Sequence, residues 1–125
     1  MNTDATFEEF LNSTPDPDFT EEGWLAKCTG RRGEAFFESW VEHIASDNGW
    51  NFYHTWRSDR SQKGYPDLHL IKDTRQIFAE LKTVKGKATT EQKEWLYDLD
   101  KVPTNEVYLW RPNDWRQIKE ILSNA

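Results

Sequence analysis

The sequence has 125 residues, of which 14% are aromatic, and a formal net charge of −6. This length suits one compact domain, whose aromatic-rich core needs no disulfide or structural metal. Cys28 is the only cysteine, which excludes an intramolecular disulfide and a cysteine-based zinc site and fits a reducing compartment. No run approaches the roughly 20 apolar residues of a membrane span, and no signal peptide is visible, so we expect a cytoplasmic protein without a membrane partner.

Charge is unevenly distributed along the chain. Residues 1–30 carry seven acids and one Lys, which gives −6, whereas residues 54–87 carry eight Lys and Arg and four acids, which gives +4. Because local charge decides whether phosphates are attracted, the second stretch is a candidate contact for nucleic acid. Ordinary variation of surface charge is the alternative. We divide the chain into an acidic N-terminal arm or tail, 1–30, and a domain, 31–125.

The first predicted elements follow a turn-rich run. Residues 12–18 contain two Pro and two Asp and cannot form a helix interior. A helix is predicted over 33–47, because apolar residues recur there at helical spacing and Asn48-Gly49 provides a stop. Five apolar residues of the arm are expected to dock on the body: Phe7, Phe10, Leu11, Trp24 and Leu25.

Three strands are predicted next. Aromatic residues that alternate with polar ones predict a strand over 50–56, followed by a polar loop over 57–65. The strands 67–71 and 76–83 then form a hairpin around the turn 72–75.

Three more elements complete the prediction. Thr89 caps a helix over about 90–100, an apolar-rich strand covers 106–110, and a last helix ends near Leu122. The resulting order, α-β-β-β-α-β-α, predicts an α/β fold with a mixed sheet and helices on its faces.

Two acids and a lysine stand at one end of the predicted hairpin. Pro66-Asp67 opens its first strand, and Glu80-Leu81-Lys82 lies near the end of its second. Side chains on a strand alternate between faces, so Glu80 and Lys82 point the same way, and a twisted hairpin brings Asp67 close to Glu80. Two adjacent carboxylates form a hard-oxygen site suited to Mg²⁺ or Mn²⁺.

This combination is sufficient for hydrolysis of a phosphodiester. Such an ion binds a phosphate oxygen and lowers the pKa of a bound water, and Lys82 could orient that water and stabilise the negative charge that develops at phosphorus. The alternative interpretation is a surface hairpin with one cross-strand salt bridge. Other Pro-Asp pairs, at 15–16 and 17–18, lie in the acidic arm. Another Glu-x-Lys, at 91–93, starts a predicted helix, where residues two apart do not share a face.

Seven short segments together resemble the virus-type replication-repair nuclease (VRR-NUC) family, a branch of the PD-(D/E)xK nuclease superfamily. They occur in the family's order and cover about residues 31–122, whereas residues 1–30 lie outside the resemblance. The segments are GEAFFE (33–38), NGW (48–50), YHT (53–55), GYPDL (64–68), FAELK (78–82), TTEQKEWL (89–96) and VYLWRP (107–112).

The resemblance implies a restriction-endonuclease-like core and roles for particular residues. Asp67 and Glu80 would be the metal-binding carboxylates, with the backbone carbonyl of Leu81 as a further ligand. Lys82 would be the catalytic lysine. Family members act on DNA, and small stand-alone members resemble Holliday-junction resolvases that work as homodimers. Cutting both strands of a branched substrate symmetrically needs two active sites related by a two-fold axis.

Two further positions have a structural alternative. Glu34 would correspond to the family's additional acid near the metal, although it could be a first-turn acid favoured by the helix dipole, and Glu38 competes for the role. Gln92 would correspond to the glutamine close to the catalytic lysine, but it also completes a capping box with Thr89. His54 is interpreted as a strand histidine with an ordinary hydrogen bond and is left outside the site.

Basic residues on both sides of the motif are the predicted phosphate-positioning group. In the alternative interpretation they are simply solvated. They are Arg57, Arg60 and Lys63 before the motif and Lys85 and Lys87 after it.

The leading hypothesis is therefore a metal-dependent endonuclease selective for branched DNA in replication, recombination or repair, of phage or mobile-element origin. A restriction or defence nuclease is a second reading, although no target-recognition domain is visible. A non-catalytic DNA-binding module is a third, against which the complete set of Asp67, Glu80 and Lys82 speaks. The fourth is a protein-interaction domain that uses the acidic arm to bind a protein partner.

Overall fold

The computed structural model describes residues 20–56 and 62–124, which form an α/β fold around one four-stranded sheet. The strand order is β1-β2-β3-β4, with β1–β2 and β2–β3 antiparallel and β3–β4 parallel. This confirms the predicted mixed sheet. The strands are β1 (Asn51–His54), β2 (Leu68–Lys72), β3 (Arg75–Leu81) and β4 (Asn105–Trp110).

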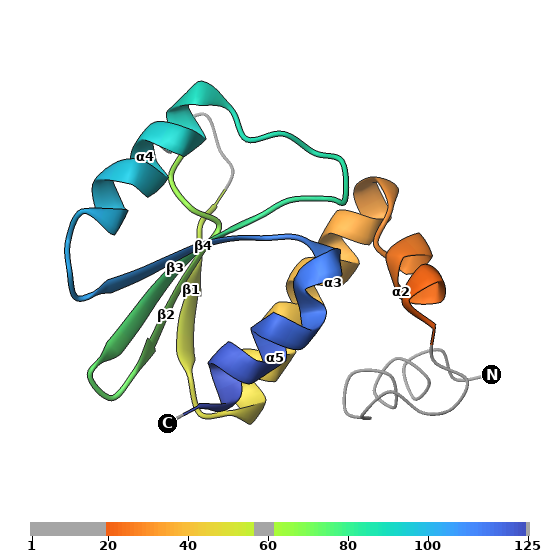
Figure 1. Cartoon of the computed structure of the whole chain (residues 1–125), viewed down its shortest axis with the longest axis horizontal. Coiled ribbons are helices and arrows are strands. Elements are labelled where there is room, and N and C mark those ends of the chain that lie inside the picture. Colours follow the sequence, from red (N-terminus) through yellow and green to blue (C-terminus); the bar gives the residue numbers. More distant parts are fainter. Residues whose placement is uncertain (1–19, 57–61, 125) are drawn as a thin grey trace.

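Helices cover both faces of the sheet (Figure 1). The longest helix, α3 (Gly30–Asp47), lies with α5 (Trp115–Ser123) on one side, and α4 (Thr90–Asp100) lies on the other. A short 3₁₀ helix, η1 (Pro112–Asp114), leads into α5. Within the described ranges, none of these helices is long and apolar enough to cross a membrane.

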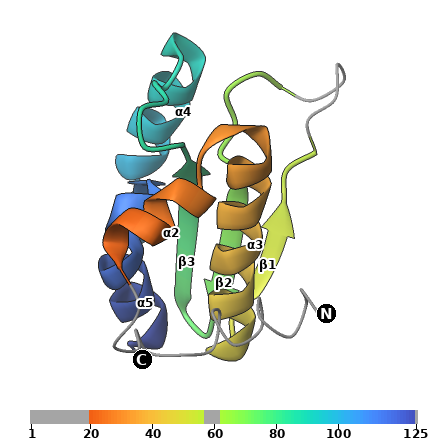
Figure 2. The same ribbon diagram turned by 90° about the vertical axis from the view of Figure 1, so that its right-hand side faces the viewer.

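The predicted order of elements was wrong at its start. An additional helix, α2 (Glu21–Lys27), precedes α3 and lies on the same side of the sheet as α3 and α5 (Figure 2). At seven residues it is too short to show an apolar period, and helices of this length depend on tertiary contacts. Thr20 caps it by accepting a hydrogen bond from the amide of Gly23 at 3.0 Å.

Packing of Trp24 stabilises this helix. Its side chain is 2% exposed, and its indole N–H donates to the carbonyl of Pro112 at 2.7 Å. Leu25 is partly buried against the same core, which confirms the docking expected for these two residues. Phe7, Phe10 and Leu11 and the turn-rich run lie outside the described residues.

The hairpin is tighter than predicted. Its loop contains only Asp73 and Thr74, because Lys72 and Arg75 already pair. Asp73 has a φ of 52°, a left-handed conformation that Asp tolerates better than most residues. The register pairs Leu68 with Ala79. Asp67 precedes this pair on one side of the hairpin, and Glu80 follows it on the other.

The core lies between the sheet and the helices α3 and α5. Alternate residues of β3, Ile77 and Ala79, belong to this core together with Leu81. Phe78 is buried on the other face, where its ring packs against Tyr65. Glu80 follows Phe78 by two residues, so its side chain leaves the strand on the α4 side.

Candidate functional site

Two carboxylates are buried at the end of the hairpin. Asp67 is 7% exposed and Glu80 is 1% exposed, and no other polar or charged residue is buried in the part of the chain that the structure describes. A buried charge is costly unless specific partners compensate it. Two such groups, one just before β2 and the other on β3, are therefore the strongest indication of a functional site in this fold.

Backbone hydrogen bonds hold Asp67 in place. Its Oδ2 accepts a bond from the amide of Leu81, the residue after Glu80, at 2.8 Å. The carbonyl of Asp67 accepts from the amide of Thr55 at 2.9 Å, and the hydroxyl of Thr55 donates to the carbonyl of Pro66 at 2.7 Å. Both neighbouring strands therefore fix the Pro-Asp segment.

A glycine lets this segment approach α4. Gly64 has a φ of +87°, and a Cβ there would lie 2.5 Å from the carbonyl carbon of Glu91. Because no side chain fits that space, α4 packs directly against the backbone that leads to Asp67.

Lys82 lies next to Glu80. Its Nζ is 3.4 Å from Glu80 Oε2, and its side chain is 17% exposed. The amide of Lys82 donates to the carbonyl of Trp110 at 2.9 Å, which continues the β3–β4 pairing past the end of β3. The acid is thus enclosed, whereas its lysine partner reaches the surface.

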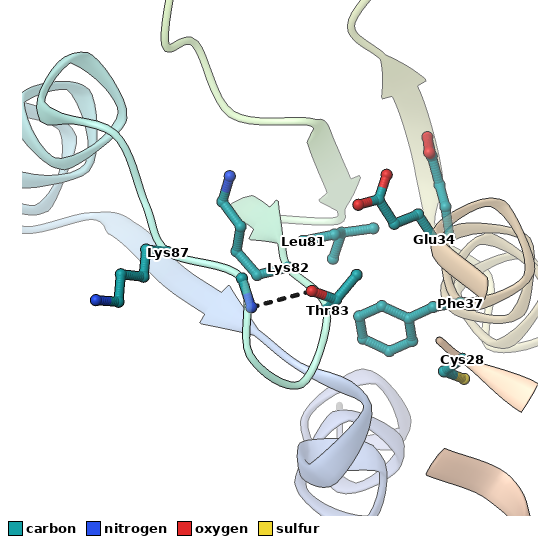
Figure 3. Close-up of a pocket in the computed structure, with 9 residues that line it drawn as sticks. Cys28, Glu34, Phe37, Leu81, Lys82, Thr83 and Lys87 are labelled. Atoms are coloured by element: carbon teal, nitrogen blue, oxygen red, sulfur yellow. Dashed lines mark hydrogen bonds between the residues drawn. The ribbon is translucent and has the colours of Figure 1, made fainter. Parts of the chain in front are cut away.

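A cavity of about 260 Å³ opens beside the lysine. Figure 3 shows Glu34 and Phe37 of α3 on one side and Lys82, Thr83 and Lys87 on the other. Leu81 and Glu38 also contribute to its wall, whereas Asp67 and Glu80 do not. The cavity therefore brings Glu34 and Glu38, the two candidates for the additional acid, together with the lysine of the motif.

Of the remaining predicted residues that the structure describes, Lys63, Lys85 and Gln92 are not part of the cavity wall. Lys63 and Lys85 are exposed. Arg57 and Arg60 lie outside the described residues. Gln92 forms a capping box: its Oε1 accepts from the amide of Thr89 at 2.8 Å.

Sequence reasoning did not assign a role to Arg111. Its guanidinium donates to the carbonyl of Thr83 at 2.7 Å and also to that of Gly86. The amide of Gly86 in turn donates to the hydroxyl of Thr83 at 3.0 Å, which Figure 3 marks with a dashed line. Arg111 thereby holds the loop that follows Lys82 and forms one wall of the cavity. In the sequence, only the position of Arg111 within the VYLWRP segment pointed to this residue.

The thiol at the cavity is not a nucleophile. Cys28 is fully buried, and this burial raises the pKa of its thiol to about 12. Because the thiolate is the reactive form, Cys28 stays protonated and inert at neutral pH.

Another group of side chains, which could hold a metal ion, lies on the α3 side of the sheet. Glu38 and Glu42 of α3 and His54 of β1 each offer one ligand atom, and these atoms lie within 4.8 Å of one another. Burial and the neighbouring Glu38 carboxylate raise the pKa of Glu42 above its ordinary value. Sequence reasoning missed Glu42, although the four-residue spacing of the two acids on a predicted helix was a usable signal.

Comparison of the chain with protein-family models, with curated proteins and with solved structures gives no match.

Proposed function

We propose that this chain is a divalent-metal-dependent DNA endonuclease that hydrolyses phosphodiester bonds. The observation that carries the proposal is the burial of Asp67, just before β2, and of Glu80 on β3, with the ammonium group of Lys82 3.4 Å from Glu80. An ordinary surface hairpin has no reason to enclose two acids, because their desolvation destabilises the fold.

The side chains at this point suit a hard divalent cation. Asp67 and Glu80 supply carboxylate oxygens, the ligands that Mg²⁺ and Mn²⁺ prefer. The backbone carbonyl of Leu81 would be a further ligand. A bound Mg²⁺ or Mn²⁺ would supply Lewis-acid polarisation of the phosphate and an acidified water.

The chain's own residues would provide the remaining functions. Lys82, which is partly exposed at the cavity, would orient the attacking water and stabilise negative charge on the phosphate. Glu34 or Glu38 would act across the cavity as the additional acid. Lys87, on the cavity wall, and the exposed Lys63 and Lys85 would position the DNA backbone.

The family, substrate and assembly belong to the same proposal. The seven segments resemble the VRR-NUC family, and this resemblance implies a restriction-endonuclease-like core that acts on branched DNA as a homodimer. The acidic arm would shield the basic surface or contact a protein partner, and the cytoplasm is the expected location.

Cleavage assays with motif variants test this function. Labelled linear duplex, single-stranded, flap and four-way-junction DNA would be incubated with the protein and Mg²⁺, Mn²⁺ or EDTA. We expect metal-dependent cleavage with preference for branched DNA. Asp67→Asn and Lys82→Ala should each reduce the cleavage rate by about 100-fold or more, because each removes a group that acts on the transition state.

The second Glu-x-Lys pattern provides a matched control. Glu91→Gln and Lys93→Ala likewise remove one carboxylate and one lysine, both at exposed positions of α4, and should leave cleavage unchanged. A folded wild-type protein that binds DNA but cuts no substrate with either metal would overturn the proposal and favour a DNA-binding module.

A further inference from the structure

Helix α3 and strand β1 bring together a histidine and two glutamates. Glu38 and Glu42 are one helical turn apart and share a face of α3, and His54 is the last residue of β1. The Nδ1 atom of His54 contacts Glu38 Oε1 and lies 3.6 Å from Glu42 Oε2. One imidazole nitrogen therefore faces both carboxylates at once.

The surroundings of the three side chains favour a cation between them. The exposed fractions are 19% for Glu38, 24% for Glu42 and 38% for His54. Helical spacing places the two carboxylates next to each other in a partly buried position, and a protonated imidazole can neutralise only one of them. A divalent ion would balance both negative charges and accept the imidazole nitrogen as a ligand.

We propose that Glu38, Glu42 and His54 bind a divalent transition-metal ion. Zn²⁺ is the ion that we expect to bind and the one used to test the site. One imidazole nitrogen and two carboxylate oxygens form a ligand set typical of zinc. Mg²⁺ prefers an all-oxygen octahedral shell and keeps several waters, so this site should bind it more weakly than Zn²⁺. The site is chemically different from the all-oxygen pair of Asp67 and Glu80.

An ion bound at this position would affect the structure in two ways. It would link α3 to β1, which among the described strands pairs with β2 alone. Glu38 also lines the cavity that contains Lys82, so a bound ion would fix one wall of that cavity. The inference stands on the geometry of the three ligands and does not depend on the proposed nuclease function.

Zinc binding can be measured with the catalytic candidate disabled. The full chain carrying Asp67→Asn would be stripped of metal and titrated with Zn²⁺, and with Mg²⁺ in parallel, by calorimetry and equilibrium dialysis. We expect one Zn²⁺ per chain, much weaker Mg²⁺ binding and a higher melting temperature with Zn²⁺. Bound Co²⁺ should give the visible absorption of a nitrogen-coordinated ion.

Single variants in the same background identify the ligands. Glu42→Gln and His54→Ala should each weaken Zn²⁺ binding by about tenfold or more and abolish the rise in melting temperature. Asp47→Asn, an exposed carboxylate at the end of the same helix, should leave binding unchanged.

Two results would overturn the site. One is less than stoichiometric Zn²⁺ binding by the folded Asp67→Asn protein, and the other is unchanged affinity in Glu42→Gln. Melting in EDTA shows whether each variant is folded. If His54→Ala does not fold, the Zn²⁺ affinity of Glu42→Gln decides whether the site exists, because this substitution keeps the shape of the side chain. Loss of nuclease activity in Asp67→Asn has no bearing on these readouts, so the two proposals fail separately.

Discussion

At the scale of single residues, Arg75 connects three elements. Its guanidinium binds Glu106 of β4 in a bidentate manner, at 2.7 and 2.8 Å, and donates to the carbonyl of Asn124 after α5 at 2.9 Å. It also lies over the ring of Trp50, 4.9 Å from its centroid. The hydrogen bonds and charge of Arg75 lower the pKa of the Glu106 carboxyl.

This lowered pKa makes the stability contribution of Glu106 depend on pH. A carboxyl whose folded-state pKa is depressed stabilises the protein above its unfolded-state pKa and loses that contribution as the pH falls through its folded-state value. Glu106→Gln should therefore lower the free energy of unfolding by about 1 kcal/mol at neutral pH, and the difference from wild type should shrink in acid.

Urea unfolding at neutral and acid pH measures this effect. Glu120→Gln, an exposed acid on α5, is the control and should show no comparable difference. A Glu106→Gln effect of the same size at both pH values would contradict the assignment of this ion pair.

At the scale of elements, the start of α4 has a complete capping box. The hydroxyl of Thr89 accepts a hydrogen bond from the amide of Gln92 at 3.2 Å, and the side-chain oxygen of Gln92 accepts one from the amide of Thr89. These reciprocal bonds satisfy two backbone donors that a helix start leaves unpaired. These bonds explain the presence of a glutamine at position 92 without a catalytic role.

Paired variants separate the two roles of Gln92. Thr89→Ala and Gln92→Ala should each lower the free energy of unfolding by about 1 kcal/mol, because each removes half of the same cap. We expect equal DNA cleavage by the two variants below their melting temperatures. If cleavage falls in Gln92→Ala alone, the glutamine also acts at the active site.

At the scale of the whole molecule, Trp24 joins the first described helix to the rest of the core. Its ring lies 5.7 Å from that of Phe36 and 5.1 Å from that of Trp40, and its indole N–H reaches η1. The segment that carries it is therefore a structural part of the fold, although it lies in the predicted acidic arm.

Removing this side chain should strongly destabilise the protein. Trp24→Ala should lower the free energy of unfolding by about 3–5 kcal/mol, because it leaves a large cavity and an unpaired carbonyl at Pro112. Trp56→Ala is the matched control, since Trp56 is 71% exposed. Equal denaturant midpoints for the two variants would show that α2 contributes little to the fold.

Several features follow from short-range rules that act within the sequence. Apolar spacing predicted α3, alternation predicted the hairpin, and Thr89 marked the start of α4, because the direction in which successive side chains point is set by the local backbone of a helix or strand. The same alternation placed Glu80 and Lys82 on one side of β3. The strand ends differed by one or two residues, and β1 proved shorter than the predicted 50–56.

Only the tertiary structure decided which distant residues meet. The sequence by itself determined the mixed sheet and the positions of the acids and lysine along the hairpin. It did not show that α2 forms, because Trp24 needs the carbonyl of Pro112, 88 residues away. Nor did it show the burial of Asp67 and Glu80 or the approach of Glu42 to His54. Burial and contacts between elements arise from packing, which depends on how the helices lie on the sheet and not on the local pattern of residues.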